Sequence, residues 1–135
     1  MTAVDARILI VDDSPTNLKL AAEVLALSGF TVSTATTAEE ALAAIETLTP
    51  ALVLMDIGLP GMDGLTLTRR LKSSPRYRGL RIVAVTAFAM RGDAQKARDA
   101  GCDGYITKPI DTRTFAAQVT AYLEHGRADP SEGAT

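Results

Sequence analysis

Acidic side chains follow two apolar runs in this 135-residue sequence. The run Arg7–Val11 leads into Asp12 and Asp13, and the run Ala51–Met55 leads into Asp56. Unbroken apolar runs bounded by turn residues are typical of strands that are covered on both faces. In a parallel α/β sheet, the carboxyl ends of the strands form the edge at which such folds bind ligands. A single aspartate there can equally cap a loop, so the choice depends on which other residues reach this edge.

Two further predicted strands bring a hydroxyl and an ammonium group to the same edge, namely Thr86 after Arg81–Val85 and Lys108 after Gly104–Thr107. Three carboxylates held close together repel one another unless a cation lies among them. Oxygen ligands with no His or Cys nearby favour Mg²⁺ over zinc. Together these groups suit phosphoryl transfer, with Asp56 as the nucleophile that forms an acyl phosphate and Thr86 as a donor to a phosphoryl oxygen. The sequence has no GxxxxGK[ST] motif, which argues against a bound nucleotide as the phosphoryl donor.

The elements that position these residues alternate between strand and helix five times. Helix signals between the strands include Ser14–Pro15 at a helix start, the capping pair Thr37 and Glu40, and Asp111 before a final helix. The strands are predicted at Arg7–Val11, Phe30–Ala35, Ala51–Met55, Arg81–Val85 and Gly104–Thr107. This alternation predicts an α/β fold of five βα units, with a doubly wound parallel sheet covered by helices on both faces.

The length and composition predict one domain over residues 1–125 and a frayed tail over 126–135. A formal net charge of −2 provides no basic surface for nucleic acid or an anionic membrane. The single cysteine, Cys102, fits a reducing compartment and is interpreted as a small packing residue. The sequence shows no signal peptide and no apolar run long enough to span a membrane, so we expect a cytoplasmic protein. The one histidine, His125, is interpreted as a helix-terminal or surface residue.

The ordered set Asp12–Asp13, Asp56, Thr86–Ala87 and Lys108–Pro109 resembles the receiver domain of two-component response regulators, the CheY-like family. The resemblance covers residues 6–124, and the five elements are specific because they occur in order at matching spacing. The stretches MDIGLPGMDG and VTAFAMRGD are most similar to stand-alone receivers of the DivK type or to receivers of hybrid kinases. The resemblance implies a flavodoxin-like sheet with strand order 2-1-3-4-5.

The resemblance also implies how the acidic site works. Asp56 would accept a phosphoryl group from a phosphohistidine on a histidine kinase or a histidine phosphotransferase. Asp13, Asp56 and the backbone carbonyl of Gly58 would ligate Mg²⁺, and Asp12 would act through a water molecule. Lys108 would pair with the phosphoryl group, and the peptide bond between it and Pro109 would be cis.

A switch is implied by the same resemblance. Thr86 would move toward the phosphoryl group and Tyr105 would rotate into the space it leaves, while the small Ala87 keeps the pocket open. Taken alone, Tyr105 is predicted to be a half-buried packing residue. Few residues follow the last predicted helix, so we expect the output to be binding of a downstream protein. Residues 91–124 would form the face that binds it. Such a protein is a signalling switch, and the only reactions that it catalyses are its own phosphorylation and slow dephosphorylation.

Two positions depart from many receivers. Gly58 has no side chain and Phe88 is apolar, so neither can orient a hydrolytic water, and we expect slow loss of the phosphoryl group. Gly58 also weakens the alternative that Asp56 is the nucleophile of a phosphohydrolase, because such sites need an acid at that position. A phosphate-independent binding module is the other alternative. Such modules normally lack one or more of the five key elements, and none is missing here. The pair Asp63–Gly64 is interpreted only as a turn signal.

Overall fold

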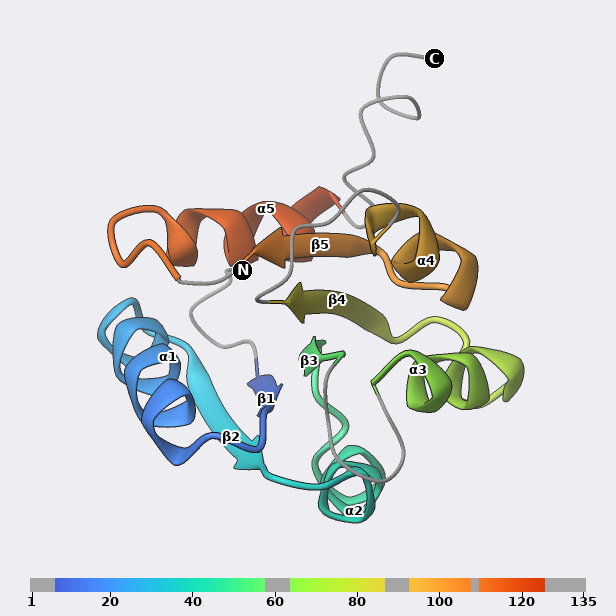
Figure 1. Ribbon diagram of the computed structural model, residues 1–135. Helices are drawn as coiled ribbons and strands as arrows, with labels where there is room; N and C mark the ends of the chain where they lie inside the picture. The colour runs from blue at the N-terminus through green and yellow to red at the C-terminus, as the bar shows by residue number, and fades with distance from the viewer. Residues whose placement is uncertain (1–6, 58–63, 87–92, 108–109, 126–135) are drawn as a thin grey trace.

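The computed structural model describes residues 7–57, 64–86, 93–107 and 110–125, which contain five strands and five helices in strict alternation. The strands form one parallel sheet in the order β2-β1-β3-β4-β5, which confirms both the predicted fold class and the strand order (Figure 1). Their bounds are β1 Arg7–Val11, β2 Thr31–Ala35, β3 Leu52–Asp56, β4 Arg81–Thr86 and β5 Gly104–Thr107. Phe30, predicted as part of the second strand, is a buried residue just before β2.

Helices cover both faces of the sheet (Figure 1). Residues of α1 and α5 pack with one hydrophobic cluster, and residues of α2, α3 and α4 pack with the other. The helices are α1 Pro15–Leu27, α2 Ala38–Leu48, α3 Gly64–Ser73, α4 Asp93–Ala100 and α5 Phe115–His125. Crossovers that place helices on both faces are what a parallel sheet requires, because both of its faces must be covered.

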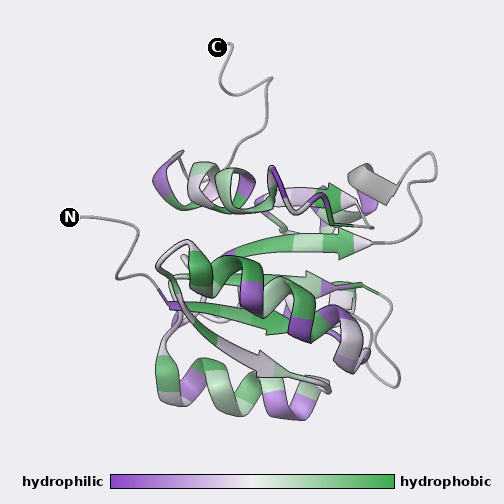
Figure 2. Ribbon diagram, turned by 90° about the vertical axis from the view of Figure 1, so that its left-hand side faces the viewer, coloured by the Kyte–Doolittle hydropathy of each residue, from purple (hydrophilic) through white to green (hydrophobic). Residues whose placement is uncertain are grey.

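The central strands carry the deepest part of the core. Every residue of β3 is buried, as is every residue of β4 after Arg81. Figure 2 shows these strands as nearly continuous hydrophobic segments, whereas the helices alternate between hydrophobic and hydrophilic residues. This contrast explains why the apolar runs in the sequence locate the strands and why the helices appear as periodic stripes.

The predicted helix starts are mostly confirmed. The Ser14 hydroxyl accepts a hydrogen bond from Asn17 N at 3.3 Å, with Pro15 as the first helical residue. Thr37 Oγ1 accepts from Glu40 N at 3.1 Å, but the Glu40 carboxylate accepts in return from Thr36 N rather than from Thr37. This bond from Thr36 N is the main reason that the pKa of Glu40 is lowered.

The last helix begins later than its cap residue suggests. Asp111 Oδ1 accepts from Arg113 N at 2.9 Å and the Asp111 carbonyl accepts from Phe115 N at 2.9 Å. Asp111 therefore closes a turn over residues 112–114 that leads into α5 at Phe115. Among the described residues, no helix is both long enough and apolar enough to cross a membrane.

Candidate functional site

The register of the sheet brings the predicted acidic residues together. Val11 of β1 pairs with Met55 of β3, so the residues that follow them in the chain, Asp12 and Asp56, reach the carboxyl edge at the same level. Asp56 in turn pairs with Val85 of β4. The position of the site is thus set by strand pairing, as the sequence pattern predicted.

Three carboxylates gather at this edge. One oxygen from each of Asp12, Asp13 and Asp56 lies within 4.8 Å of the others. Asp12 and Asp56 are buried, with 5% and 8% of their surfaces exposed, whereas Asp13 is exposed to solvent. The cluster therefore combines two carboxylates that are enclosed by protein with one that is open to solvent.

The loop after β1 holds Asp12 in a defined place. The Asp12 N–H donates to the carbonyl of Ala35 at 3.0 Å, which extends the pairing of β1 with β2 by one residue. The Asp12 carboxylate accepts from Ser14 N at 2.9 Å, just before α1 begins. The same turn thus fixes an acidic side chain and starts a helix.

The predicted switch residues lie on neighbouring strands. Thr86, the last residue of β4, is only 2% exposed and pairs with Thr107 of β5. Tyr105 is half-buried and packs against the core cluster beneath α2, α3 and α4, as the packing interpretation expected. The Tyr122 hydroxyl of α5 accepts from Tyr105 N at 3.3 Å and donates to Tyr105 O at 3.4 Å, so α5 contacts the backbone of this residue.

Several predicted site residues lie outside the described residues. They are Gly58, Ala87, Phe88, Lys108 and Pro109. The predictions that concern the Gly58 carbonyl, the position of Lys108 and the cis bond before Pro109 therefore remain predictions.

Gly64 is a residue of the site whose importance the sequence analysis missed. It is buried at the start of α3, and a Cβ atom at this position would lie 2.3 Å from the Asp56 carbonyl oxygen and 2.9 Å from Ile57 Cα. The absence of a side chain therefore lets α3 begin directly against the backbone that carries Asp56. The dipeptide Asp63–Gly64 indicated a turn, but nothing in the sequence indicated this close approach.

The donor set is suited to a hard divalent cation. All three side chains offer carboxylate oxygens, and one oxygen from each can approach a common point because the three lie within 4.8 Å of one another. Oxygen donors of this kind favour Mg²⁺ or Ca²⁺ over zinc or copper. The chain is thus a doubly wound α/β domain that carries a carboxylate cluster at the carboxyl edge of its sheet.

Comparison with known proteins identifies the family within this class. The model of the response regulator receiver domain matches residues 8–120, which is most of the chain, so the chain belongs to this family. The chain is 39% identical over 116 residues to the polar-differentiation response regulator DivK of Brucella ovis, and the match covers 86% of this chain and 94% of that protein. The predicted resemblance to receivers, including those of the DivK type, is thereby confirmed.

Solved structures agree with this assignment. A CheY-like response regulator receiver domain protein from Methanospirillum hungatei has a TM-score of 0.81 and 34% identity, covering 90% of this chain and 95% of that one. A putative response regulator from Chloroflexus aurantiacus has a TM-score of 0.84 and 32% identity, covering 89% of this chain and 98% of that one. Receiver domains are signalling switches, and the fold of this chain is theirs.

Proposed function

We propose that this chain is a single-domain response regulator of a two-component phosphorelay, which acts in the cytoplasm and signals by phosphorylation-dependent protein binding. The observation that carries this proposal is the convergence of Asp12, Asp13 and Asp56 within 4.8 Å at the carboxyl edge of the sheet. Family membership supports it, since receiver domains are switches. The similarity to DivK over 94% of that protein's length supports a regulator of this size.

Asp56 is the proposed phosphoacceptor. A carboxylate oxygen of Asp56 attacks the phosphorus of a phosphohistidine on a histidine kinase or histidine phosphotransferase. The phosphorus–nitrogen bond breaks, the imidazole leaves with the electron pair and takes up a proton, and an acyl phosphate forms on Asp56. Burial of Asp56 supports this role, because the carboxylate stands at the end of the buried strand β3, which limits the positions that it can adopt.

Asp13, Asp56 and the carbonyl of Gly58 would hold Mg²⁺, with Asp12 acting through a water molecule. Bound there, the ion would neutralise charge on the carboxylates and on the phosphoryl oxygens. Lys108 would pair with a phosphoryl oxygen, and the buried Thr86 would donate its hydroxyl to another.

The output of the switch is proposed to be a protein-binding face over residues 91–124. Thr86 and Tyr105 lie on adjacent strands, and Tyr105 is contacted by Tyr122 of α5, which supports coupling between the site and this face. Added charge at one edge would bias the packing there between two states. The partners are thus proteins, a kinase or phosphotransferase upstream and a binding target downstream, and the chain turns over no other substrate.

The test is phosphorylation by acetyl phosphate, with and without Mg²⁺, followed by intact mass measurement. We expect one added phosphoryl group that requires Mg²⁺ and is absent from Asp56→Asn. Asp99→Asn is the matched control, because it removes the same charge from an exposed position on α4, and it should be phosphorylated like the wild type.

Each competing function predicts a different outcome. A phosphohydrolase would consume many equivalents of acetyl phosphate per protein. A phosphate-independent module would show no added group even with a phosphohistidine protein as the donor. Phosphorylation that persists in Asp56→Asn would contradict the choice of Asp56.

A further inference from the structure

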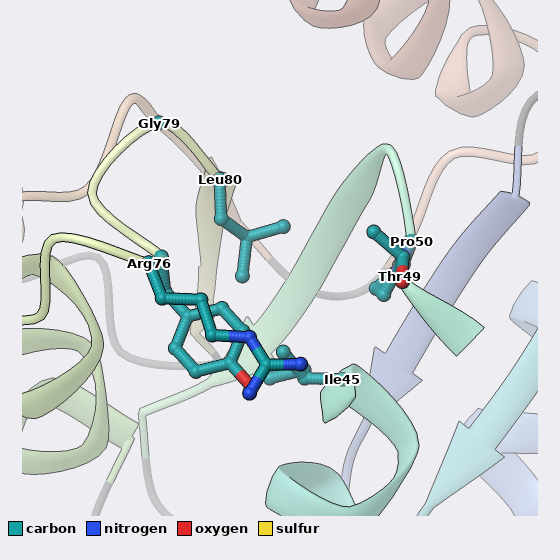
Figure 3. A pocket seen from close by; sticks show the side chains of 7 residues that line it. Ile45, Thr49, Pro50, Arg76, Gly79 and Leu80 are labelled. Carbon is teal, nitrogen blue, oxygen red and sulfur yellow. The ribbon is translucent and has the colours of Figure 1, made fainter. Parts of the chain in front are cut away.

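A pocket lies at the opposite end of the sheet from the acidic cluster. It has a volume of about 320 Å³ and lies between the end of α2 and the turn that leads from α3 to β4 (Figure 3). Pockets of this size fall at the lower limit for small-molecule sites, which are mostly apolar and carry a few polar groups. Ligand binding in this pocket would be separate from the proposed function and would not involve Asp56.

The backbone on both sides of the pocket is held in place by hydrogen bonds. Thr49 ends α2 in the left-handed conformation, with φ at 49°, and its N–H donates to Ile45 O at 3.1 Å. On the other side, Leu80 N donates to Tyr77 O at 3.0 Å, and Lys72 Nζ donates to Leu80 O at 2.6 Å. Because both sides are fixed by the fold, the pocket is formed before any ligand arrives, which reduces the entropy lost on binding.

Most of the pocket's lining is carbon. Ile45 is 2% exposed and Pro50 is also buried, while Tyr77 and Leu80 are half-buried against the core. Among the described residues that line the pocket, Arg76 is the one that carries a charge. This combination of an apolar wall and a single cation is complementary to a ligand with an apolar body and one negative charge.

The Arg76 guanidinium is positioned so that a ligand can replace its present partner, Glu46. It lies over the Tyr77 ring, 5.2 Å from the ring centroid, and Figure 3 shows the side chain extending from the turn toward the end of α2. Its ion pair with Glu46 is long, at 3.7 Å, and the two side chains are 63% and 66% exposed. Exposed pairs of this kind contribute little to stability, so an incoming carboxylate can replace Glu46 at small cost.

The surrounding charges also favour an anion over a cation. Arg78 is exposed on the same turn, and Arg7 Nη1 donates to Leu48 O at the end of α2. Lys72, which also donates to Leu80 O, is paired with Asp103, so Arg76, Arg78 and Arg7 are the cations at these two segments that are set against the exposed Glu46. A net positive field at the opening attracts anions and repels cations.

We propose that this pocket binds a small amphipathic carboxylate, with an aryl or branched alkyl group against Ile45 and Leu80 and the carboxylate on the Arg76 guanidinium. Such a ligand satisfies both the carbon lining and the one cation. An arginine can meet a carboxylate with two parallel hydrogen bonds, which a neutral amide of the same shape cannot match.

The test uses three probes of nearly the same shape, namely 3-phenylpropionate, 3-phenylpropanamide and 3-phenylpropylamine. Each is titrated into the full-length protein while backbone amide chemical shifts are recorded. We expect 3-phenylpropionate to bind with a Kd of about 1 mM, with the largest shifts at Thr49, Gly79 and Leu80. The amide should bind about fivefold more weakly and the amine more weakly still.

Three variants make the test specific. Gly79 lines the pocket, and a Cβ atom there would meet nothing within 4 Å, so Gly79→Leu should fold and fill the opening. It should abolish binding of all three probes. Arg76→Gln should remove the preference for the carboxylate over the amide, while Arg78→Gln, the matched control on the same turn, should retain most of it.

The proposal is overturned if the shifts map to another part of the protein, or if the three probes bind alike to the wild type. It is also overturned if Gly79→Leu binds 3-phenylpropionate as well as the wild type does. None of these outcomes bears on phosphorylation of Asp56, so the two proposals fail separately.

Discussion

At the carboxyl end of the sheet, three carboxylates lie within 4.8 Å of one another, and two of them are buried. At the amino end, the half-buried Asp103 carboxylate is matched instead by Lys72 Nζ at 3.0 Å and by Ile82 N at 2.9 Å. Like charges held together oppose folding, whereas a matched and hydrogen-bonded pair supports it once it is in place. The carboxylate cluster at the carboxyl end is therefore suited to a cation from outside the chain, whereas Asp103 at the amino end already has a cation of the chain itself as its partner.

Two glycines offer the strongest way to test how tightly each end is packed. A Cβ atom on Gly64, at the carboxyl end, would lie 2.3 Å from the Asp56 carbonyl oxygen, while one on Gly79, at the amino end, would meet nothing within 4 Å. We expect Gly64→Ala to lower the free energy of unfolding by about 3 kcal/mol, because backbone rather than a flexible side chain must move. Urea denaturation followed by circular dichroism measures this, and phosphorylation by acetyl phosphate should slow as well.

Gly79→Ala is the matched control, and its free energy of unfolding should change by less than about 0.5 kcal/mol. Equal effects of the two substitutions would contradict the view that α3 begins in enforced contact with the strand that carries Asp56.

The ion pairs at the amino end differ in burial, and this difference can be measured. The Lys72 and Asp103 side chains are 17% and 13% exposed, and Lys72 also donates to Leu80 O and Arg78 O. We expect Lys72→Met to lower the free energy of unfolding by about 2 kcal/mol, because it leaves the Asp103 carboxylate without its cation. Denaturant titrations in low and high salt should give similar losses, since a sheltered pair is screened weakly.

The exposed pair of Arg76 and Glu46 provides the comparison. Arg76→Gln should lower the free energy of unfolding by less than about 0.5 kcal/mol, and high salt should remove even that difference. A large loss for Arg76→Gln would mean that this guanidinium is not available to the proposed carboxylate ligand.

The buried thiol of Cys102 should make the free energy of unfolding depend on pH. It is buried in the junction between α4 and β5, and burial raises the pKa of its thiol from 9.0 to about 11, with the Asp103 charge acting in the same direction. A raised pKa in the folded state means that stability is fully present below pH 9 and is lost as the pH rises from about 9 through about 11. The loss should total about 2 kcal/mol.

Cys102→Ala isolates this effect from other groups that titrate in the same range. The wild type should lose more stability than the variant between pH 9 and pH 11, as measured by urea denaturation at each pH. Parallel curves for the two proteins would show that the thiol is no better shielded when folded than when unfolded.

The carboxyl end was largely predictable from sequence because strand periodicity and residue type determine it. Covered parallel strands appear as apolar runs, and the residues that follow them must share one edge, so the sequence alone places Asp12, Asp13 and Asp56 together. The strand order was a different matter. It came from the resemblance to receivers, because alternation of strands and helices alone allows several orders.

The amino end was not predictable, because its features depend on pairings that leave no local pattern. Lys72 and Asp103 are 31 positions apart and look like ordinary surface residues in sequence. The pocket forms where Thr49–Pro50 meets the turn between α3 and β4, and neither segment carries a sequence pattern that indicates a pocket. The same applies to Gly64, whose contact with Asp56 is fixed by how α3 packs rather than by the residues beside it.

A further prediction at the carboxyl end concerns the lifetime of the acyl phosphate that we propose for Asp56. Gly58 lies outside the described residues and, having no side chain, cannot orient a water molecule for hydrolysis. We expect the phosphorylated wild type to persist for minutes or longer, and Gly58→Asn to shorten that lifetime about fivefold, the effect of one added hydrogen bond of roughly 1 kcal/mol in the transition state. Decay of the phosphorylated mass after removal of acetyl phosphate measures both, with Gly79→Asn as the control at the opposite end of the sheet. A wild-type lifetime of seconds, or a longer lifetime in Gly58→Asn, would mean that groups other than the side chain at position 58 control hydrolysis.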